Sequence, residues 1–165
     1  MEEPDNVYDQ MIEDYTQKIN SDPENAAAYY NKRGVCYYNK GDYDQAIADC
    51  TKAIEVDPNY HNAYDNRGVS YHKKEMYGKA IEDYSKAIEL NPSYANSYYN
   101  LSCNYCMQND KEKALAYFRI ALEKGFSDFD HLELDDDLNL IREEQEFKNL
   151  IEEYKEPLDY SIGMF

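Results

Sequence analysis

The sequence predicts an all-α solenoid, in which pairs of helices stack one upon the next. A period of 34 residues relates residues 27–60 to residues 61–94, with identical residues at sixteen of the 34 positions. Each period contains two segments whose apolar residues recur at spacings of three and four, as on one face of a helix. Each period also closes near a proline, Pro58 or Pro92, which cannot continue a helix.

The second period shows how each helix pair is expected to form. Tyr64, Gly68 and Tyr71 follow one face of a first helix, and a turn at residues 75–77 comes next. The apolar stripe of the second helix consists of Ala80, Ile81, Tyr84, Ala87 and Ile88. Glycine within a helix costs about 1 kcal/mol relative to alanine. Because glycine recurs at positions 34 and 68, we expect the paired helices to pack closely.

The organisation follows from the period and its loss at both ends. We expect an N-terminal leader and half-repeat helix (1–26), three repeats (27–60, 61–94 and 95–128), an acidic helical cap (129–155) and a flexible tail (156–165). Residues 6–21 echo a second helix, with Lys18 where the repeats have alanine, either as a natural cap or as part of a longer array. The cap is predicted to contain helices at 135–140 and 143–154.

These motifs resemble the tetratricopeptide repeat family. The matching residues are Tyr30, Gly34, Tyr37, Ala46, Cys50, Ala53 and Pro58, and in the next repeat Tyr64, Gly68, Tyr71, Ala80, Tyr84, Ala87 and Pro92. Departures are Cys50 where an aromatic is usual, and Ser102 and Gly125-Phe126 in the third repeat. The resemblance implies a right-handed superhelix of helix pairs whose first helices line a concave, protein-binding groove. It is specific for the fold and says little about the partner.

Composition restricts the partners. The 165 residues carry a formal net charge of −17, which disfavours nucleic acid and anionic membranes and favours a basic protein or peptide. No segment reaches the roughly 20 apolar residues that span a bilayer. The acidic start, Met1–Asp5, is not a signal peptide. The four cysteines are expected to be free thiols in a reducing compartment, so the expected location is cytoplasmic.

The family pattern places polar and aromatic side chains of the first helices in the groove. The candidate peptide-binding residues are Asn31, Lys32, Tyr38, Asn62, Asp65, Asn66, His72, Lys73, Asn96, Tyr99 and Asn100, accompanied by Val35, Val69, Cys103 and Met107. An asparagine amide can donate to and accept from the backbone of an extended peptide. The alternative is that these asparagines only solvate a helix face. A clamp for the acidic tails of heat-shock chaperones is disfavoured, because the required groove bases are missing.

Other polar residues are assigned structural roles. Arg33 with Asp49 and Arg67 with Asp83 are expected to form ion pairs, since an unpaired buried arginine would be costly. The pair Cys103 and Cys106 lacks further metal ligands nearby, and the acidic run at residues 135–137 is interpreted as a solvated helix N-terminus. We expect no cofactor, no metal and no enzymatic activity.

The sequence therefore predicts an adaptor or scaffold that binds an extended peptide in the groove of its repeats. The alternative is a structural oligomer, in which copies of the chain associate through the apolar C-terminal tail or an exposed terminal helix. In that case the groove serves self-association, as in a homodimer.

Overall fold

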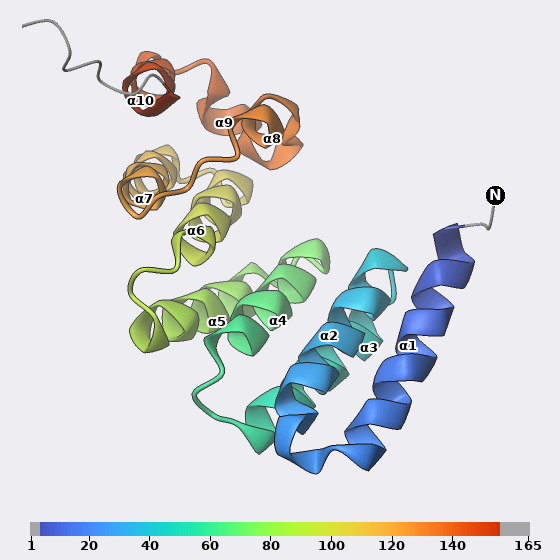
Figure 1. Ribbon diagram of the computed structural model, residues 1–165. Coiled ribbons are helices and arrows are strands. Elements are labelled where there is room, and N and C mark those ends of the chain that lie inside the picture. Colours follow the sequence, from blue (N-terminus) through green and yellow to red (C-terminus); the bar gives the residue numbers. More distant parts are fainter. Residues whose placement is uncertain (1–3, 156–165) are drawn as a thin grey trace, which may run out of the picture. The chain divides into compact units, whose positions relative to one another are not determined.

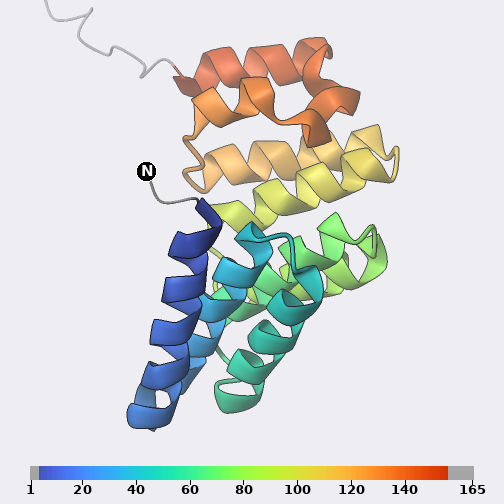
Figure 2. The ribbon, with the colours of Figure 1, turned by 90° about the vertical axis from the view of Figure 1, so that its right-hand side faces the viewer.

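A computed structural model describes residues 4–155 of the chain, which form helices and no strand within that range. The chain divides into two compact units, residues 1–97 and 98–165, and each unit is considered by itself. The tail at 156–165, with the docking role considered for it, lies outside the described residues. Figures 1 and 2 show the helices in two views.

The first unit contains a leading helix followed by two helix pairs. Helix α1 spans Pro4–Ser21, and a short 3-10 turn, η1 (Pro23–Asn25), leads into α2 (Ala26–Asn39) and α3 (Tyr43–Val56). The second pair is α4 (His61–Lys73) and α5 (Tyr77–Leu90). Each helix packs on the next, α1 on α2, α2 on α3, α3 on α4 and α4 on α5. The helix expected ahead of the first repeat is therefore present as α1, and it packs against α2 of the first pair.

Short turns set the helix boundaries. Gly41 has a φ of +79°, a left-handed conformation suited to glycine, at the turn between α2 and α3. Asp42 then caps α3, because its side chain accepts a hydrogen bond from the backbone N–H of Gln45 at 3.2 Å. At the other end of α3, Asp57 is extended, as expected for the residue before a proline.

Small residues bring the paired helices together. The side chains facing between the helices include fully buried alanines, namely Ala46, Ala53, Ala63, Ala80 and Ala87. A Cβ atom added at Gly34 would lie 3.1 Å from Cys50 Sγ, and one at Gly68 would lie 2.7 Å from the ring of Tyr84. The glycines therefore occupy the points of closest approach, which accounts for their recurrence despite their poor helix propensity.

The second unit contains the rest of α6 (Ala95–Met107), whose first residues belong to the first unit, and α7 (Lys111–Glu123). Three short elements follow, α8 (Phe129–Leu134), the 3-10 turn η2 (Asp136–Leu138) and α9 (Asn139–Arg142), and then α10 (Gln145–Lys155). Phe118 of α7 stacks on Phe147 of α10 with ring centroids 4.6 Å apart. Ion pairs from Lys111 to Glu144 and from Arg119 to Glu146 flank this contact.

The cap differs from the sequence prediction. A helix was expected at 135–140, but the chain there is extended at Asp135 and then forms η2 and α9. The helix at Phe129–Leu134 was not predicted. The reason lies in Asp135, whose carboxylate accepts the backbone N–H of Asp137 at 3.0 Å and so supports a tight turn in place of a continuous helix.

Candidate functional site

A small recess opens between the two first helices of unit 1. Its volume is about 170 Å³, and it is lined by Gly34, Val35, Tyr38, Asn39, Cys50, Asn66, Val69 and Ser70. The recess exists because the side chains are small where α2 approaches α4, namely at Gly34 and Ser70, and because α3 contributes the small side chain of Cys50. Apolar side chains line most of it and the Asn66 amide lies at its edge, so it can accommodate one apolar side chain beside a hydrogen-bonding group.

Two asparagines of the predicted groove are joined here. Asn66 Nδ2 donates to Asn31 Oδ1 at 2.9 Å, and Asn31 is buried, with 6% of its surface exposed. Cys50 Sγ lies 3.9 Å from the same oxygen, and burial raises the pKa of this thiol to about 12. Asn66 is half-buried. One N–H and the amide oxygen of Asn66 make no further hydrogen bond within residues 4–155, so both can bind a ligand.

Several residues expected to line an open groove are instead buried. Asp65 accepts a hydrogen bond from Ser97 Oγ at 2.6 Å and has 5% of its surface exposed. His72, 7% exposed, packs edge-on against Tyr77. With Asn31, these two side chains stabilise the packing of the repeats, and this corrects the expectation that all three present themselves to a peptide. The prediction was wrong because the sequence position of a polar residue in a first helix does not distinguish a side chain that faces solvent from one that faces a neighbouring helix.

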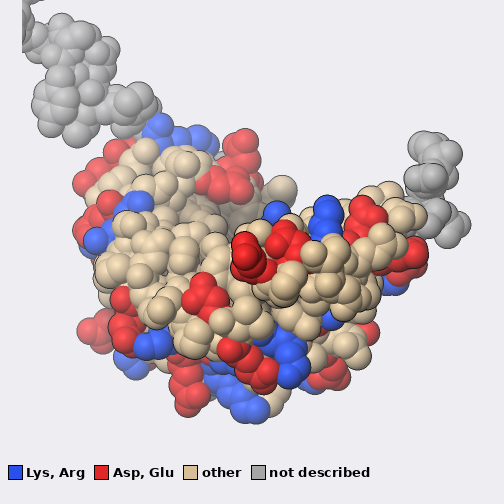
Figure 3. All heavy atoms as spheres, turned by 60° about the horizontal axis from the view of Figure 1, so that its bottom comes forward, with Lys and Arg blue, Asp and Glu red and all other residues tan. Residues whose placement is uncertain are grey.

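The remaining predicted groove residues are more accessible. Lys32, Lys73 and Asn96 are exposed, and Tyr38, Asn62 and Asn100 are half-buried. Tyr38 lines the recess and its ring packs against Tyr43 with centroids 5.5 Å apart. On the face shown in Figure 3, acidic and basic side chains are interspersed among uncharged ones.

The structure brings both expected ion pairs together. Arg33 binds Asp49 through Nε and Nη2, both at 2.7 Å, and Arg67 binds Asp83 in the same bidentate manner at 2.8 and 2.7 Å. The second pair shows two opposing effects. Its hydrogen bond to Asp83 raises the pKa of Arg67, and burial raises the pKa of the Asp83 carboxyl.

The third nitrogen of each guanidinium reaches the preceding helix. Arg33 Nη1 donates to Thr16 Oγ1 at 2.9 Å, and Arg67 Nη1 donates to Thr51 Oγ1 at 3.1 Å. Each arginine therefore ties its first helix to the second helix of its own pair and to the helix before it.

Asp135 organises a polar cluster in unit 2. Its carboxylate accepts a hydrogen bond from the Tyr99 hydroxyl and lies 3.4 Å from His131 Nε2 and 3.8 Å from Cys103 Sγ. Its backbone oxygen accepts from Arg142 Nη2 at 2.5 Å. The acidic run does lie at a helix N-terminus, because Asp135 caps η2 and Asp136 and Asp137 follow in its first turn. The expectation that the run is solvated is wrong for Asp135, whose side chain is only 13% exposed.

The same cluster removes Tyr99 from the predicted groove. Tyr99 is 6% exposed, and its ring stacks on Phe126 with centroids 4.3 Å apart. Burial raises the pKa of its hydroxyl, and burial also raises the pKa of Cys103 well above its usual value and that of Cys106 to about 12. Tyr99 therefore packs the cap onto α6 and is buried, which corrects the expectation that its ring is exposed in the groove.

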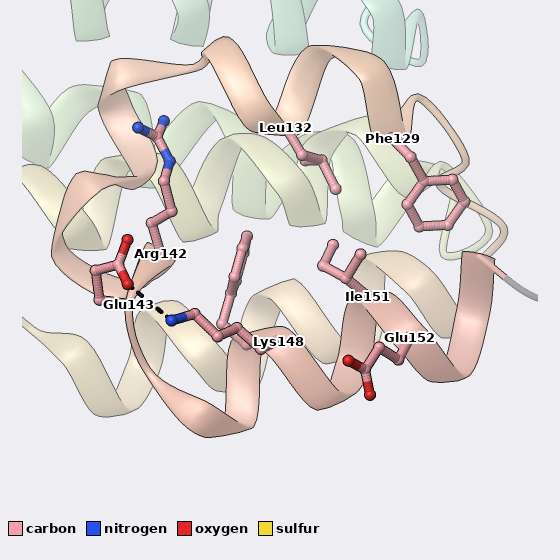
Figure 4. A pocket seen from close by; sticks show the side chains of 8 residues that line it. Phe129, Leu132, Arg142, Glu143, Lys148, Ile151 and Glu152 are labelled. Atoms are coloured by element: carbon pink, nitrogen blue, oxygen red, sulfur yellow. Dashed lines mark hydrogen bonds and ion pairs between the residues drawn. The ribbon is translucent and has the colours of Figure 1, made fainter.

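A second pocket, of about 360 Å³, lies between α8 and α10 of unit 2 (Figure 4). Phe129 and Leu132 from α8 and Phe147 and Ile151 from α10 form its apolar walls. Lys148 binds Glu143 at 2.7 Å at one end, and the nearby Arg142 Nε is buried without a hydrogen-bond partner within the described residues. No local sequence pattern predicts this pocket, because it depends on how the irregular cap folds back.

Two negative findings concern the described residues. In residues 4–155, no group of three or more His, Cys, Asp or Glu side chains is placed to hold a metal ion. Over the same range, no helix is both long and apolar enough to cross a membrane.

Paired helices with a 34-residue period, stacked one pair on the next, define a class of α-helical repeat proteins. Family comparison gives the same class, matching the tetratricopeptide repeat at residues 27–60 and 62–94, and a second family model of that description at residues 84–116. The chain belongs to the tetratricopeptide repeat family.

Curated relatives match a short part of the chain. An SGT1 homolog of Oryza sativa subsp. japonica is 40% identical over 60 residues, 36% of this chain and 16% of that protein. Small glutamine-rich tetratricopeptide repeat-containing protein 2 of Saccharomyces cerevisiae is 39% identical over 57 residues, 34% of this chain and 16% of that protein. Human serine/threonine-protein phosphatase 5 is 39% identical over 57 residues, 34% of this chain and 11% of the phosphatase. The matched segment is therefore a small part of each relative.

Solved structures share the fold over more of the chain. The first tetratricopeptide domain of Spaghetti (RPAP3), bound to the HSP90 peptide SRMEEVD, has a TM-score of 0.61 and 26% identity, covering 66% of this chain and 86% of that one. The second such domain, bound to the same peptide, has a TM-score of 0.57 and 26% identity, covering 59% and 90%. MamA has a TM-score of 0.58 at 23% identity, covering 71% and 77%, and shows the fold alone.

Proposed function

We propose that this chain is a protein-interaction adaptor that binds an extended peptide segment along α2 and α4. The observation that carries the proposal is the recess beside Asn66, where an apolar pocket adjoins an amide with a free acceptor and donor. A peptide side chain enters the recess, and its backbone pairs with Asn66. The two similar structures with a bound heptapeptide support peptide binding as the kind of function.

In this proposal, the fit of one apolar side chain in the recess and the hydrogen bonds from Asn66 to the peptide backbone select the ligand. Contacts to carboxylates of the peptide contribute less. Asn31 is occupied in holding Asn66, and the exposed bases on the first helices are Lys32 and Lys73. The formal net charge of −17 favours ligands with basic residues around an apolar anchor. We therefore propose a basic peptide with one medium-sized apolar side chain as the preferred ligand, ahead of an acidic chaperone tail.

A competition experiment on the full chain tests this function. Fluorescently labelled peptides would include a library with a central apolar residue flanked by lysines, and SRMEEVD as the acidic representative. Binding would be followed by anisotropy for the wild type and for Asn66→Ala and Val69→Phe, the second of which fills the recess. Asn59→Ala is the matched control, because Asn59 is exposed and does not line the recess.

The expected result is at least tenfold weaker binding of the selected peptide by both recess variants and unchanged binding by the control. A selected peptide that binds the recess variants as tightly as the wild type would refute this site. Preference for SRMEEVD over every basic peptide would keep the site but overturn the proposed ligand.

Self-association is the second candidate function, favoured by the exposed apolar side chains of α1. Val7 is 47% exposed and Met11 is 37% exposed. Light scattering after size-exclusion chromatography would reveal a dimer. Self-association through the C-terminal tail, residues 156–165, would be tested by repeating the measurement on a chain that ends at Lys155.

A further inference from the structure

Helix α1 packs against α2 in the same way as α3 packs against α4. Arg33 Nη1 donates to Thr16 on α1, and Arg67 Nη1 donates to Thr51 on α3. A second ion-pair contact repeats in the same register, with Lys40 bound to Asp9 of α1 and Lys74 bound to Asp44 of α3. Because Thr16 precedes Thr51 by 35 residues and Asp9 precedes Asp44 by the same number, α1 is aligned with the second helix of each pair.

This register identifies a further face of α1. In each of the two pairs, the second helix packs against the first helix of the same pair through a row of four residues. Along the sequence, successive residues of this row are three, one and three positions apart. The row is Ala46, Asp49, Cys50 and Ala53 on α3, and Ala80, Asp83, Tyr84 and Ala87 on α5. All eight residues are buried. The equivalent row on α1 is Met11, Asp14, Tyr15 and Lys18.

On α1 that row is more exposed, although the Tyr15 ring stacks on Tyr29 of α2 with centroids 6.4 Å apart and Lys18 Nζ lies 5.4 Å from the centroid of the Tyr15 ring. Met11 is 37% exposed, whereas the equivalent alanines are 1% and 0% exposed. Asp14 and Lys18 are exposed and Tyr15 is half-buried. Asp14 has no hydrogen bond or ion pair in residues 4–155, although both equivalent aspartates bind an arginine. Figure 1 shows α1 at the end of the row of unit-1 helices, with α2 beside it.

We propose that this row of α1 is a docking face for an α-helix supplied by another protein chain. Charge complementarity specifies the first feature of the occupant. Asp14 stands where Asp49 and Asp83 each bind a guanidinium through two hydrogen bonds, so the occupant presents an arginine to Asp14.

Packing specifies the second feature. Tyr15 aligns with Tyr84, whose ring leaves no room for a Cβ atom at Gly68, the residue after Arg67. The occupant therefore carries glycine directly after its arginine. Among the helices of residues 4–155, α4 has that combination against a tyrosine, so its sequence is the natural probe for the face. This site lies on α1, away from the recess between α2 and α4, and does not depend on the proposed peptide binding.

A fused chain tests whether the face accepts such a helix. Residues 61–76 would be joined directly ahead of Tyr8, which aligns with Tyr77, so that a copy of α4 and its turn precedes α1. The copy should raise the unfolding midpoint by about 5 °C relative to a fusion with the same sixteen residues scrambled. Asp14→Asn should remove most of that rise in the fusion while leaving the midpoint of the original chain unchanged.

The matched control is Glu13→Gln, which makes the same change in charge at the neighbouring exposed position. A fusion no more stable than its scrambled form would overturn the proposal. So would equal effects of Asp14→Asn and Glu13→Gln in the fusion, since the contact would then be nonspecific.

A second experiment tests an occupant supplied in trans. A synthetic peptide of residues 61–76 would be titrated into the full chain, with backbone amide shifts followed by NMR. We expect amide shifts at Met11 and Tyr15. An arginine-to-glutamine substitution in the peptide should weaken its binding at least fivefold. Asn66→Ala in the chain should leave peptide binding unchanged. Shifts confined to α2 and α4, or no binding at about 2 mM peptide, would overturn docking in trans. A dimer of the unmodified chain that dissociates on Met11→Lys would make a second copy the occupant and overturn the partner helix.

Discussion

The ring of Tyr84 lies so close to Gly68 that an added Cβ atom would be 2.7 Å from its nearest carbon. The contact joins the two helices of the second pair at their closest approach. Gly34, at the equivalent place in the first pair, faces a smaller neighbour, because Cys50 stands where the second pair has Tyr84.

This difference predicts unequal effects of the same substitution. Gly68→Ala should lower the free energy of unfolding by about 1–3 kcal/mol, because the aromatic ring must shift in a closely packed interface. Gly34→Ala should change it by less than about 1 kcal/mol, since the nearest contacts are 3.1 and 3.2 Å and alanine favours the helix. Urea unfolding of the two variants measures this, and equal losses would show that Tyr84 does not control the packing.

The ion pair of Arg67 and Asp83 should be costly to break from one side. Arg67→Met leaves Asp83, whose side chain is 8% exposed, without its counterion, and should cost about 3 kcal/mol. Arg67→Met with Asp83→Leu should recover most of that loss. The control is Lys86→Met, which breaks an exposed pair with Glu89 and should cost less than about 0.5 kcal/mol. Similar losses for the double and single arginine variants would contradict this account.

The same pair predicts a pH dependence. Burial raises the pKa of Asp83, and the hydrogen bond to Arg67 opposes this, so Arg67→Met should raise the Asp83 pKa further. The folded variant then binds more protons than the unfolded chain above pH 3.8, and its stability rises as pH falls through the raised pKa. The deficit of Arg67→Met relative to wild type should therefore be smaller at pH 4 than at pH 7. A deficit that grows on acidification would refute the assignment.

Asp110 predicts the opposite behaviour. It caps α7 by accepting the backbone N–H of Lys113, and the Lys113 side chain also binds it, which lowers the pKa of its carboxyl. Its stabilising effect is therefore present above pH 3.8 and lost as pH falls through the lowered pKa. The unfolding midpoint of Asp110→Ala should lie below that of wild type at neutral pH and approach it in acid. Asp110→Asn, which keeps a capping oxygen but does not titrate, should stay separated from Asp110→Ala at every pH.

The four cysteines should be unreactive in the folded chain. All are buried free thiols, and burial raises the pKa of Cys50 and Cys106 to about 12. Because the thiolate is the reactive form, a chromogenic disulfide reagent at pH 8 should react more than about 100-fold more slowly than with unfolded chain. A single fast thiol in the native protein would reveal an accessible or activated cysteine.

The repeat, its helix pairs and the two ion pairs could be predicted because they depend on local spacing that recurs. Glycine at positions 34 and 68 indicates close approach directly, since glycine has a poor helix propensity and needs another reason to recur within a helix. The match of Arg33 to Asp49 was visible because both residues recur together 34 positions later.

The cap was harder to predict because nothing in it recurs. Asp135 looked like one member of an acidic run, yet it joins Tyr99, Cys103, His131 and Arg142. The contacts to Tyr99 and Cys103 connect residues more than thirty positions apart along the chain, and no local pattern records them. The predicted helix at 135–140 differs for a local reason, because the Asp135 side chain caps the 3-10 turn η2, and α9 begins only after that turn.

Local sequence patterns were enough to predict the fold family, the helix pairs and the close packing at Gly34 and Gly68, because helical periodicity and steric limits act over a few residues. Which polar side chains face solvent became clear only from the packing of the folded chain. Asn31, Asp65, His72 and Tyr99 share the helical pattern of groove residues, yet each is buried against a neighbouring element. Exposure depends on what packs over a residue, and that is set by contacts between distant parts of the chain.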